Sequence, residues 1–98
     1  MTNKEQELFG EEVIERVAEN NEDAIVLEPR STFNRAIIGS DTDYRIVYSV
    51  KRIIDALMED NEIDETDALE HFEYNTLGTF RGMQDNNKPL FIYEDFVV

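Results

Sequence analysis

Residues 44–61 change from the period of a strand to the period of a helix within a few positions. The run YRIVYS at 44–49 is rich in β-branched and aromatic side chains, which predicts a strand. From Val50 onward the apolar residues follow helical spacing, and Ser49 is in position to cap the first turn. The apolar face of this predicted helix consists of Val50, Ile53, Ile54, Leu57 and Met58. A strand that runs directly into an amphipathic helix favours a fold of mixed α and β elements.

The N-terminal segment predicts an acidic helix. Thr2 and Glu5 have the spacing of a capping box, and two asparagines at 20–21 are typical of a helix end. The apolar stripe of this helix consists of Phe9, Val13 and Val17. Gly10 weakens a helix by about 1 kcal/mol relative to alanine, so we expect the regular part to begin near Glu11.

Two further strands are predicted between this helix and the strand at 44–49. They are DAIVLE at 23–28, which Pro29 ends, and NRAIIGS at 34–40. The short DTD turn should join the second of them to the next strand as an antiparallel hairpin, with Gly39 supplying a bulge.

A third helix should begin at Asp64 as its N-cap, carry acids in its first turn and be broken at Gly78. Its expected inner face consists of Ala68, Leu69, Phe72 and Thr76, and Asn75 should hold the exit turn through its amide. The run PLFIYEDF at 89–96 predicts the last strand. We expect the clustered aromatics Phe72, Tyr74, Phe80, Phe91 and Tyr93 to fill the core between this helix and this strand.

The resulting order is helix, three strands, two helices and a strand. It predicts an α+β fold with a small, mostly antiparallel sheet of about four strands and helices on one face. The chain length favours a single domain over residues 1–98, in which 1–21 form the N-terminal acidic helix and 22–98 the α+β core.

Few residues could carry catalysis. The chain has no cysteine and a single histidine, His71, so the usual zinc sites and nucleophile triads cannot be built. His71 could pair with Asp67 on one helix face. Neither a phosphate-binding glycine loop nor a complete calcium-loop pattern occurs. The sequence therefore predicts a protein that is not an enzyme and takes no cofactor and no metal.

The net charge of −14 is segregated along the chain. Residues 1–28 carry nine acids and two bases, 29–54 two acids and five bases, and 55–98 twelve acids and two bases. Such a surface repels nucleic acid and anionic membranes and suits a basic partner, although acids can also serve solubility alone. The sequence predicts no signal peptide and no membrane span, so we expect a cytoplasmic protein. We expect it to bind neither nucleic acid nor a membrane directly. Whether the five bases of 29–54 form one patch is left open.

Several segments together resemble a family of small, acidic, uncharacterised proteins encoded by phages and bacterial mobile elements. They are EDAIVLEP, NRAIIGS, RIVYSVKRIIDALME, DALEHFEYNTLGTF and PLFIYED, which lie within residues 22–93. The most specific of these motifs is EYNTLG, two dozen residues after VYS. The chain departs from the pattern in its N-terminal helix, in RSTFN and in FRGMQDNNK. The resemblance implies a phage or mobile-element origin and brings no catalytic residues.

Charge and resemblance together suggest an inhibitor that occupies the basic nucleic-acid channel of a host or defence protein. The carboxylates expected to imitate phosphates are Glu11, Glu12, Glu15, Glu19, Asp60, Glu62, Glu65 and Glu70. The alternative is a regulatory or scaffold module that forms a homodimer through a strand edge or an aromatic patch.

Overall fold

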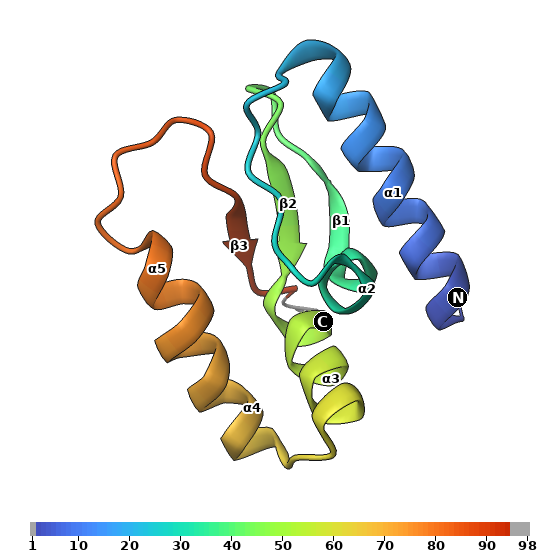
Figure 1. Ribbon diagram of the computed structural model, residues 1–98, viewed down its shortest axis with the longest axis vertical. Helices are drawn as coiled ribbons and strands as arrows, with labels where there is room; N and C mark the ends of the chain where they lie inside the picture. The colour runs from blue at the N-terminus through green and yellow to red at the C-terminus, as the bar shows by residue number, and fades with distance from the viewer. Residues whose placement is uncertain (1, 95–98) are drawn as a thin grey trace.

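Helices surround a small mixed sheet in the computed structural model, which describes residues 2–94 (Figure 1). The helices are α1 (Asn3–Asn20), α2 (Arg30–Phe33), α3 (Val50–Asn61), α4 (Glu65–His71) and α5 (Gly78–Phe80). A 3₁₀ turn η1 (Asn34–Ala36) follows α2, and a π-helical segment η2 (Phe72–Leu77) joins α4 to α5. The strands are β1 (Ile37–Ser40), β2 (Ile46–Ser49) and β3 (Leu90–Ile92). The predicted α+β class is confirmed, with three strands instead of four.

The sheet has the order β1-β2-β3. β1 and β2 form the predicted antiparallel hairpin, and its register shifts between Ile37 and Gly39, as expected of a bulge. β3 runs parallel to β2, so the sheet is mixed and not mostly antiparallel as predicted. Parallel neighbours need a long crossover connection, and residues 50–89 supply one. Residues 95 and 96 of the predicted last strand lie outside the described residues.

The predicted strand at 23–28 is wrong. These residues are not paired in the sheet; the Ile25 N–H donates to the carbonyl of Asn87, and the Leu27 N–H donates to the hydroxyl of Tyr48 at 2.9 Å. Residues 30–36 then turn into α2 and η1, so the next strand begins at Ile37 and not at 34. With α4, η2 and α5 counted as one helical stretch, the order is α-α-β-β-α-α-β, because residues 23–28 form no strand and α2 and η1 precede β1, with η1 at the predicted start of the second strand.

The capping predictions for three helices are confirmed. The Thr2 hydroxyl accepts from the Glu5 N–H while the Glu5 carboxylate accepts from the Thr2 N–H, each at 3.1 Å. Ser49 caps α3 and Asp64 caps α4 through their side chains. Because its capping box is complete, α1 begins at Asn3, and the expected later start near Glu11 is wrong.

Gly10 has a packing role in α1. It is buried where α1 crosses η1, and a β-carbon placed there would lie 2.3 Å from the carbonyl oxygen of Asn34. Only a glycine allows the helix to approach the backbone of η1 this closely. The loss of helix propensity at Gly10 therefore accompanies close packing of α1 against the core.

The third predicted helix is longer than expected. Residues 65–80 are continuously helical, with η2 in the middle, and Gly78 has ordinary right-handed helical angles and does not break the chain. Ala68, Phe72 and Thr76 are buried as predicted, but Leu69 is 37% exposed. Residues at i and i+4 occupy the inner stripe, and Leu69 lies beside it.

An aromatic cluster packs residues 65–80 against the sheet. Phe91 of β3 contacts Phe72 edge to face, with ring centroids 5.5 Å apart, and lies 6.0 Å from Phe80 and 5.9 Å from Tyr48. Burial raises the pKa of Tyr48 to about 12, so its hydroxyl stays neutral while it accepts from Leu27. Three of the five expected core aromatics confirm the prediction, whereas Tyr74 and Tyr93 are 81% and 65% exposed.

Candidate acidic interaction surface

The glutamates of α1 form a row along its solvent side. Glu7, Glu11, Glu15 and Glu19 are spaced at i, i+4, so they lie above one another, while Val13 and Val17 face the core. Glu11, Glu12, Glu15 and Glu19 are all exposed, as the sequence predicted. Within residues 2–94, none of these carboxylates forms an ion pair. The row therefore presents uncompensated negative charge to solvent.

A second group of the predicted acids lies around the connection from α3 to α4. Glu62 is the left-handed C-cap of α3, and Glu65 and Glu70 are exposed on α4. The described residues provide no ion pair for these three either. Glu62, Glu65 and Glu70 therefore resemble the α1 row in exposure and lack of compensation.

Asp60 differs from the other predicted acids. Its Oδ2 accepts from the Thr32 hydroxyl at 2.6 Å and lies 2.7 Å from Nη2 of Arg35. Partial burial opposes ionisation, but the hydrogen bonds from Thr32 and Arg35 and the nearby positive charge hold the pKa of Asp60 below its usual value. Asp60 joins α2 to α3, and its charge is already neutralised within the protein.

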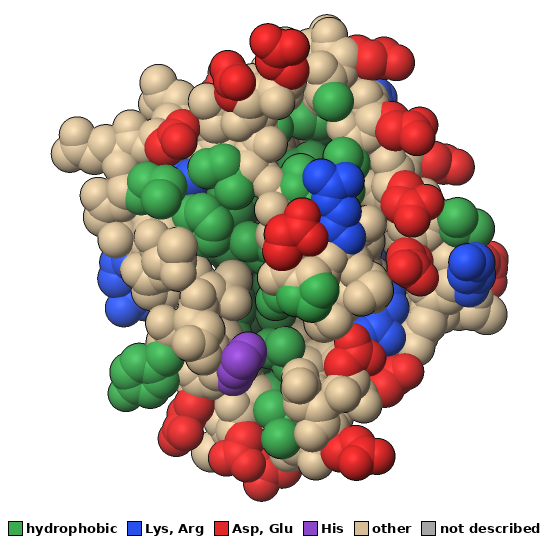
Figure 2. All heavy atoms as spheres, in the orientation of Figure 1, with side chains coloured by type: hydrophobic (Ala, Val, Ile, Leu, Met, Phe, Trp, Pro, Cys, Tyr) green, Lys and Arg blue, Asp and Glu red, His purple; other side chains and the backbone are tan. Residues whose placement is uncertain are grey.

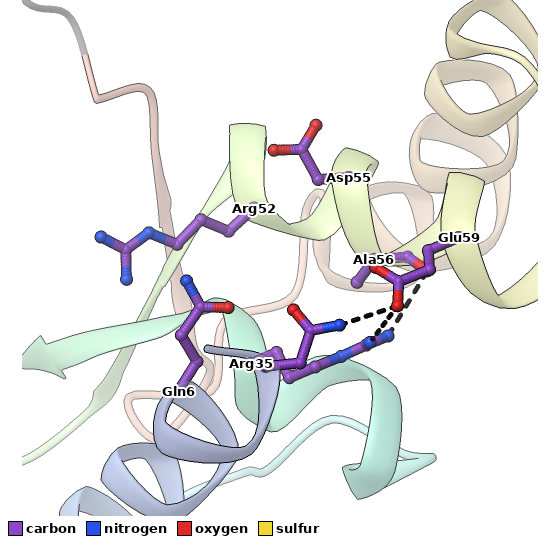
Figure 3. A pocket seen from close by; sticks show the side chains of 7 residues that line it. Gln6, Arg35, Arg52, Asp55, Ala56 and Glu59 are labelled. Carbon is purple, nitrogen blue, oxygen red and sulfur yellow. Dashed lines mark hydrogen bonds and ion pairs between the residues drawn. The ribbon is translucent and has the colours of Figure 1, made fainter. Parts of the chain in front are cut away.

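Arg35 is the centre of this internal network. Its side chain is 10% exposed; Nη1 lies 3.6 Å from Oε1 of Glu59, and Nη2 donates to the carbonyl oxygen of Ala56 at 3.5 Å. Figure 3 shows Arg35 pointing toward Glu59 at the edge of a hollow of about 280 Å³ between α1 and α3, with Arg52 directed away. Arg52 pairs instead with Glu94, with Nε 3.2 Å from Oε1. Both arginines of this hollow are therefore neutralised from inside the chain.

The five bases of residues 29–54 do not form a free basic patch. Each has an acidic partner: Arg30 with Glu28, Arg35 with Glu59 and Asp60, Arg45 with Asp41 and Asp43, Lys51 with Asp55, and Arg52 with Glu94. The Asp41 carboxylate also accepts from the backbone N–H groups of Asp43 and Arg45 in the hairpin turn. The positive charge of the middle segment is used to neutralise neighbouring acids.

Acidic side chains lie along much of the outline of one face of the molecule (Figure 2). Figure 2 shows acidic side chains along the top, right and lower edges, around a centre with apolar and polar groups. The start of α1 meets the second half of α3, where the Asn3 amide donates to Glu59 at 2.7 Å. Glu11 lies about 12 Å further along the axis of α1 than Asn3, so the α1 row extends away from this contact and the two groups of acids remain separate.

His71 lies beside a shallow hollow of about 250 Å³ between α2, α3 and η2. Its Nδ1 is 3.2 Å from the side-chain nitrogen of Asn75, and no ion pair with Asp67 forms in the described part of the chain. The Asn75 amide therefore binds the imidazole. The prediction that it holds an exit turn is wrong. Asp60, which also lines the hollow, is held by Arg35.

No cluster of three or more metal-ligating side chains occurs within residues 2–94. Over the same range, every helix is too short or too polar to cross a bilayer. Comparison with known proteins gives no relative: no family model matches the chain, and no curated protein or solved structure is significantly similar to it.

Proposed function

We propose that this chain is a non-enzymatic interaction protein whose acidic surface binds a basic, nucleic-acid-binding protein and blocks it. The observation that carries the proposal is the contrast between the unpaired carboxylate row on α1 and the complete pairing of the bases in residues 29–54. Charges without an internal partner are the ones available to an external one.

The geometry of the row supports this function. Carboxylates one helical turn apart repeat about every 6 Å along the axis of α1, which gives a regular line of negative charge similar in kind to a phosphate backbone. Glu7, Glu11 and Glu15 also line one side of a hollow of about 260 Å³, whose other lining residues include Arg30, the ion-pair partner of Glu28. A surface of one sign accelerates encounter with an oppositely charged partner.

The proposed surface consists of Glu11, Glu12, Glu15, Glu19, Glu62, Glu65 and Glu70. We leave Asp60 out because Arg35 and Thr32 already hold its carboxylate. The resemblance to phage and mobile-element proteins is our reason for proposing a partner in a bacterial host or its defence system, with the chain acting in the host cytoplasm.

The test is affinity capture from nuclease-treated bacterial lysate, followed by displacement with duplex DNA or with RNA. We expect the wild type to retain a basic nucleic-acid-binding protein that nucleic acid displaces. A row variant with Glu11, Glu15 and Glu19 replaced by glutamine should lose it.

A matched control removes the same charge from positions outside the proposed surface. Glu22→Gln, Asp23→Asn and Asp85→Asn together should leave capture nearly unchanged, since these exposed acids lie outside the helices that carry the proposed surface. Equal loss in both triple variants would reduce the effect to net charge and contradict a role for the row. A captured protein that nucleic acid fails to displace would contradict mimicry.

A further inference from the structure

An open groove runs between α3 and α4, on the opposite side of these helices from the His71 hollow. It has a volume of about 450 Å³, within the range of sites that receive the side chains of a ligand. One wall is the stripe Val50, Ile54 and Met58 of α3, and the other is Leu69 of α4, with Tyr93 at the end. Leu69 and Tyr93 are both exposed, so the groove presents apolar surface to solvent.

The rim of this groove is acidic. Glu65 and Glu73 flank Leu69 at i−4 and i+4 on the second wall, and no ion pair compensates either of them among residues 2–94. On the first wall, Lys51 and Asp55 neutralise each other at 3.0 Å. The groove thus combines an apolar floor with net negative charge at its border.

We propose that this groove receives a basic amphipathic helix of a partner protein. This deepens the proposed function, on which it rests, by naming the structural element through which the basic partner docks. A helix laid into a groove between two helices anchors apolar side chains at i, i+3 or i+4 and i+7, and lysines or arginines beside these anchors would meet Glu65 and Glu73.

Charge argues against a second copy of the chain as the occupant. Each copy carries a net charge of −14, and a twofold contact through the groove would bring the Glu65 and Glu73 of both copies to the same interface. A basic helix gains attraction from the same carboxylates. The complementary partner is therefore cationic as well as apolar.

The experiment is a fluorescence anisotropy titration of the full chain with a labelled synthetic peptide of about 16 residues. Its leucines lie at helical i, i+3, i+4 and i+7 positions, and lysines fill the opposite face. A scrambled peptide of identical composition has no apolar face. We expect the amphipathic peptide to bind at least about tenfold more tightly than the scrambled one, and equal affinity for both would overturn the inference.

Leu69→Asp separates apolar docking from simple charge attraction. The substitution makes the protein more negative, so a purely electrostatic contact would strengthen, whereas docking in the groove should weaken about tenfold. Tyr74→Ala is the matched control, because Tyr74 is 81% exposed on the same helical segment and does not line the groove. Circular dichroism verifies that both variants are folded.

The two proposals can fail separately. Suppose that Leu69→Asp binds the peptide as well as the wild type, while the Glu11, Glu15 and Glu19 glutamine variant binds it poorly. This result would contradict docking in the groove and support binding by the acidic row. A homodimer in sedimentation that Leu69→Asp dissociates would assign the groove to a second copy. A gain in peptide affinity on removal of residues 95–98 would assign it to the chain itself, and either result overturns a partner helix.

Discussion

The segment from Glu28 to Asp60 and the helix α1 handle charge in opposite ways. In the first, every base has an acidic partner, and the most buried of them, Arg35 of η1, pairs with Glu59 and Asp60 of α3. In α1, glutamates recur every fourth residue with no ion pair in the described chain. The positive charge of this segment is thus paired within the chain, both at the partly buried Arg35 network and at the surface, and unpaired negative charge remains on α1 and around the α3–α4 connection of the described residues.

This difference separates charges that hold the fold from charges that oppose it. A buried arginine that loses its partner, or a buried carboxylate that loses its arginine, costs several kcal/mol. Like charges at i and i+4 on a helix surface repel each other. A chain that keeps a repulsive row on α1 gives up some stability there, which is consistent with a use for the row outside the fold.

The largest effect is expected from Arg35→Ala. The substitution leaves the Asp60 carboxylate and the carbonyl oxygens of Thr32 and Ala56 without the guanidinium that they contact, so the free energy of unfolding should fall by about 2–4 kcal/mol. Urea denaturation measures it. Arg30→Ala is the control, since its pair with Glu28 is more than half exposed and should change stability by less than about 0.5 kcal/mol. Equal losses in the two variants would remove the distinction between inner and outer pairs.

Gly10→Ala tests how α1 is attached to the rest of the molecule. Alanine normally stabilises a helix by about 1 kcal/mol relative to glycine. Here the added β-carbon meets the carbonyl oxygen of Asn34 at 2.3 Å, so we expect a loss of about 1–3 kcal/mol and a lower melting temperature. Ala18→Gly, at an exposed position of the same helix, should cost about 1 kcal/mol through propensity alone. A more stable Gly10→Ala variant would contradict the close contact between α1 and η1.

Elements with local signals could be predicted from the sequence. The capping box at Thr2, the caps at Ser49 and Asp64 and the hairpin after β1 all depend on residues within a few positions of one another. The exposure of the α1 glutamates followed from helical period alone. These features need no information about distant parts of the chain.

Features that depend on distant partners could not be read in this way. Residues 23–28 have the composition of a strand, but the hydroxyl of Tyr48 and the loop at Asn87 take up their backbone donors. Arg35 and Asp60 are 25 positions apart in the numbering, and nothing near either one signals their pairing. The groove between α3 and α4 could not be predicted because Leu69 has the spacing of a core residue. Ala68 and Phe72 fill the inner positions of this helix, and Leu69 is left exposed.

Acid should act on the paired region. The pKa of Asp60 is lowered in the folded protein, so its ionised form stabilises the fold above the pKa of the unfolded state, and this contribution is lost as the pH falls through the folded value. We expect Asp60→Asn to be less stable than the wild type near pH 7 and to lose less further stability in acid. Urea midpoints at pH 7 and at about pH 3 measure the difference. A parallel loss in both proteins would show that Asp60 does not contribute to acid sensitivity.

The smallest effect concerns the unpaired row. Each like-charge pair at i, i+4 costs about 0.2–0.5 kcal/mol, and salt screens this repulsion, so sodium chloride should raise the urea midpoint of the wild type slightly. In the variant with Glu11, Glu15 and Glu19 replaced by glutamine the rise should be smaller. Chloride is preferred to sulfate, which also strengthens apolar burial. If salt stabilised both proteins equally, the repulsion would lie elsewhere on the surface, and the row would lose its distinction from the remaining acids. If salt raises the urea midpoint of the wild type alone, the glutamates of the row repel one another, and a cationic partner would reduce this repulsion on binding.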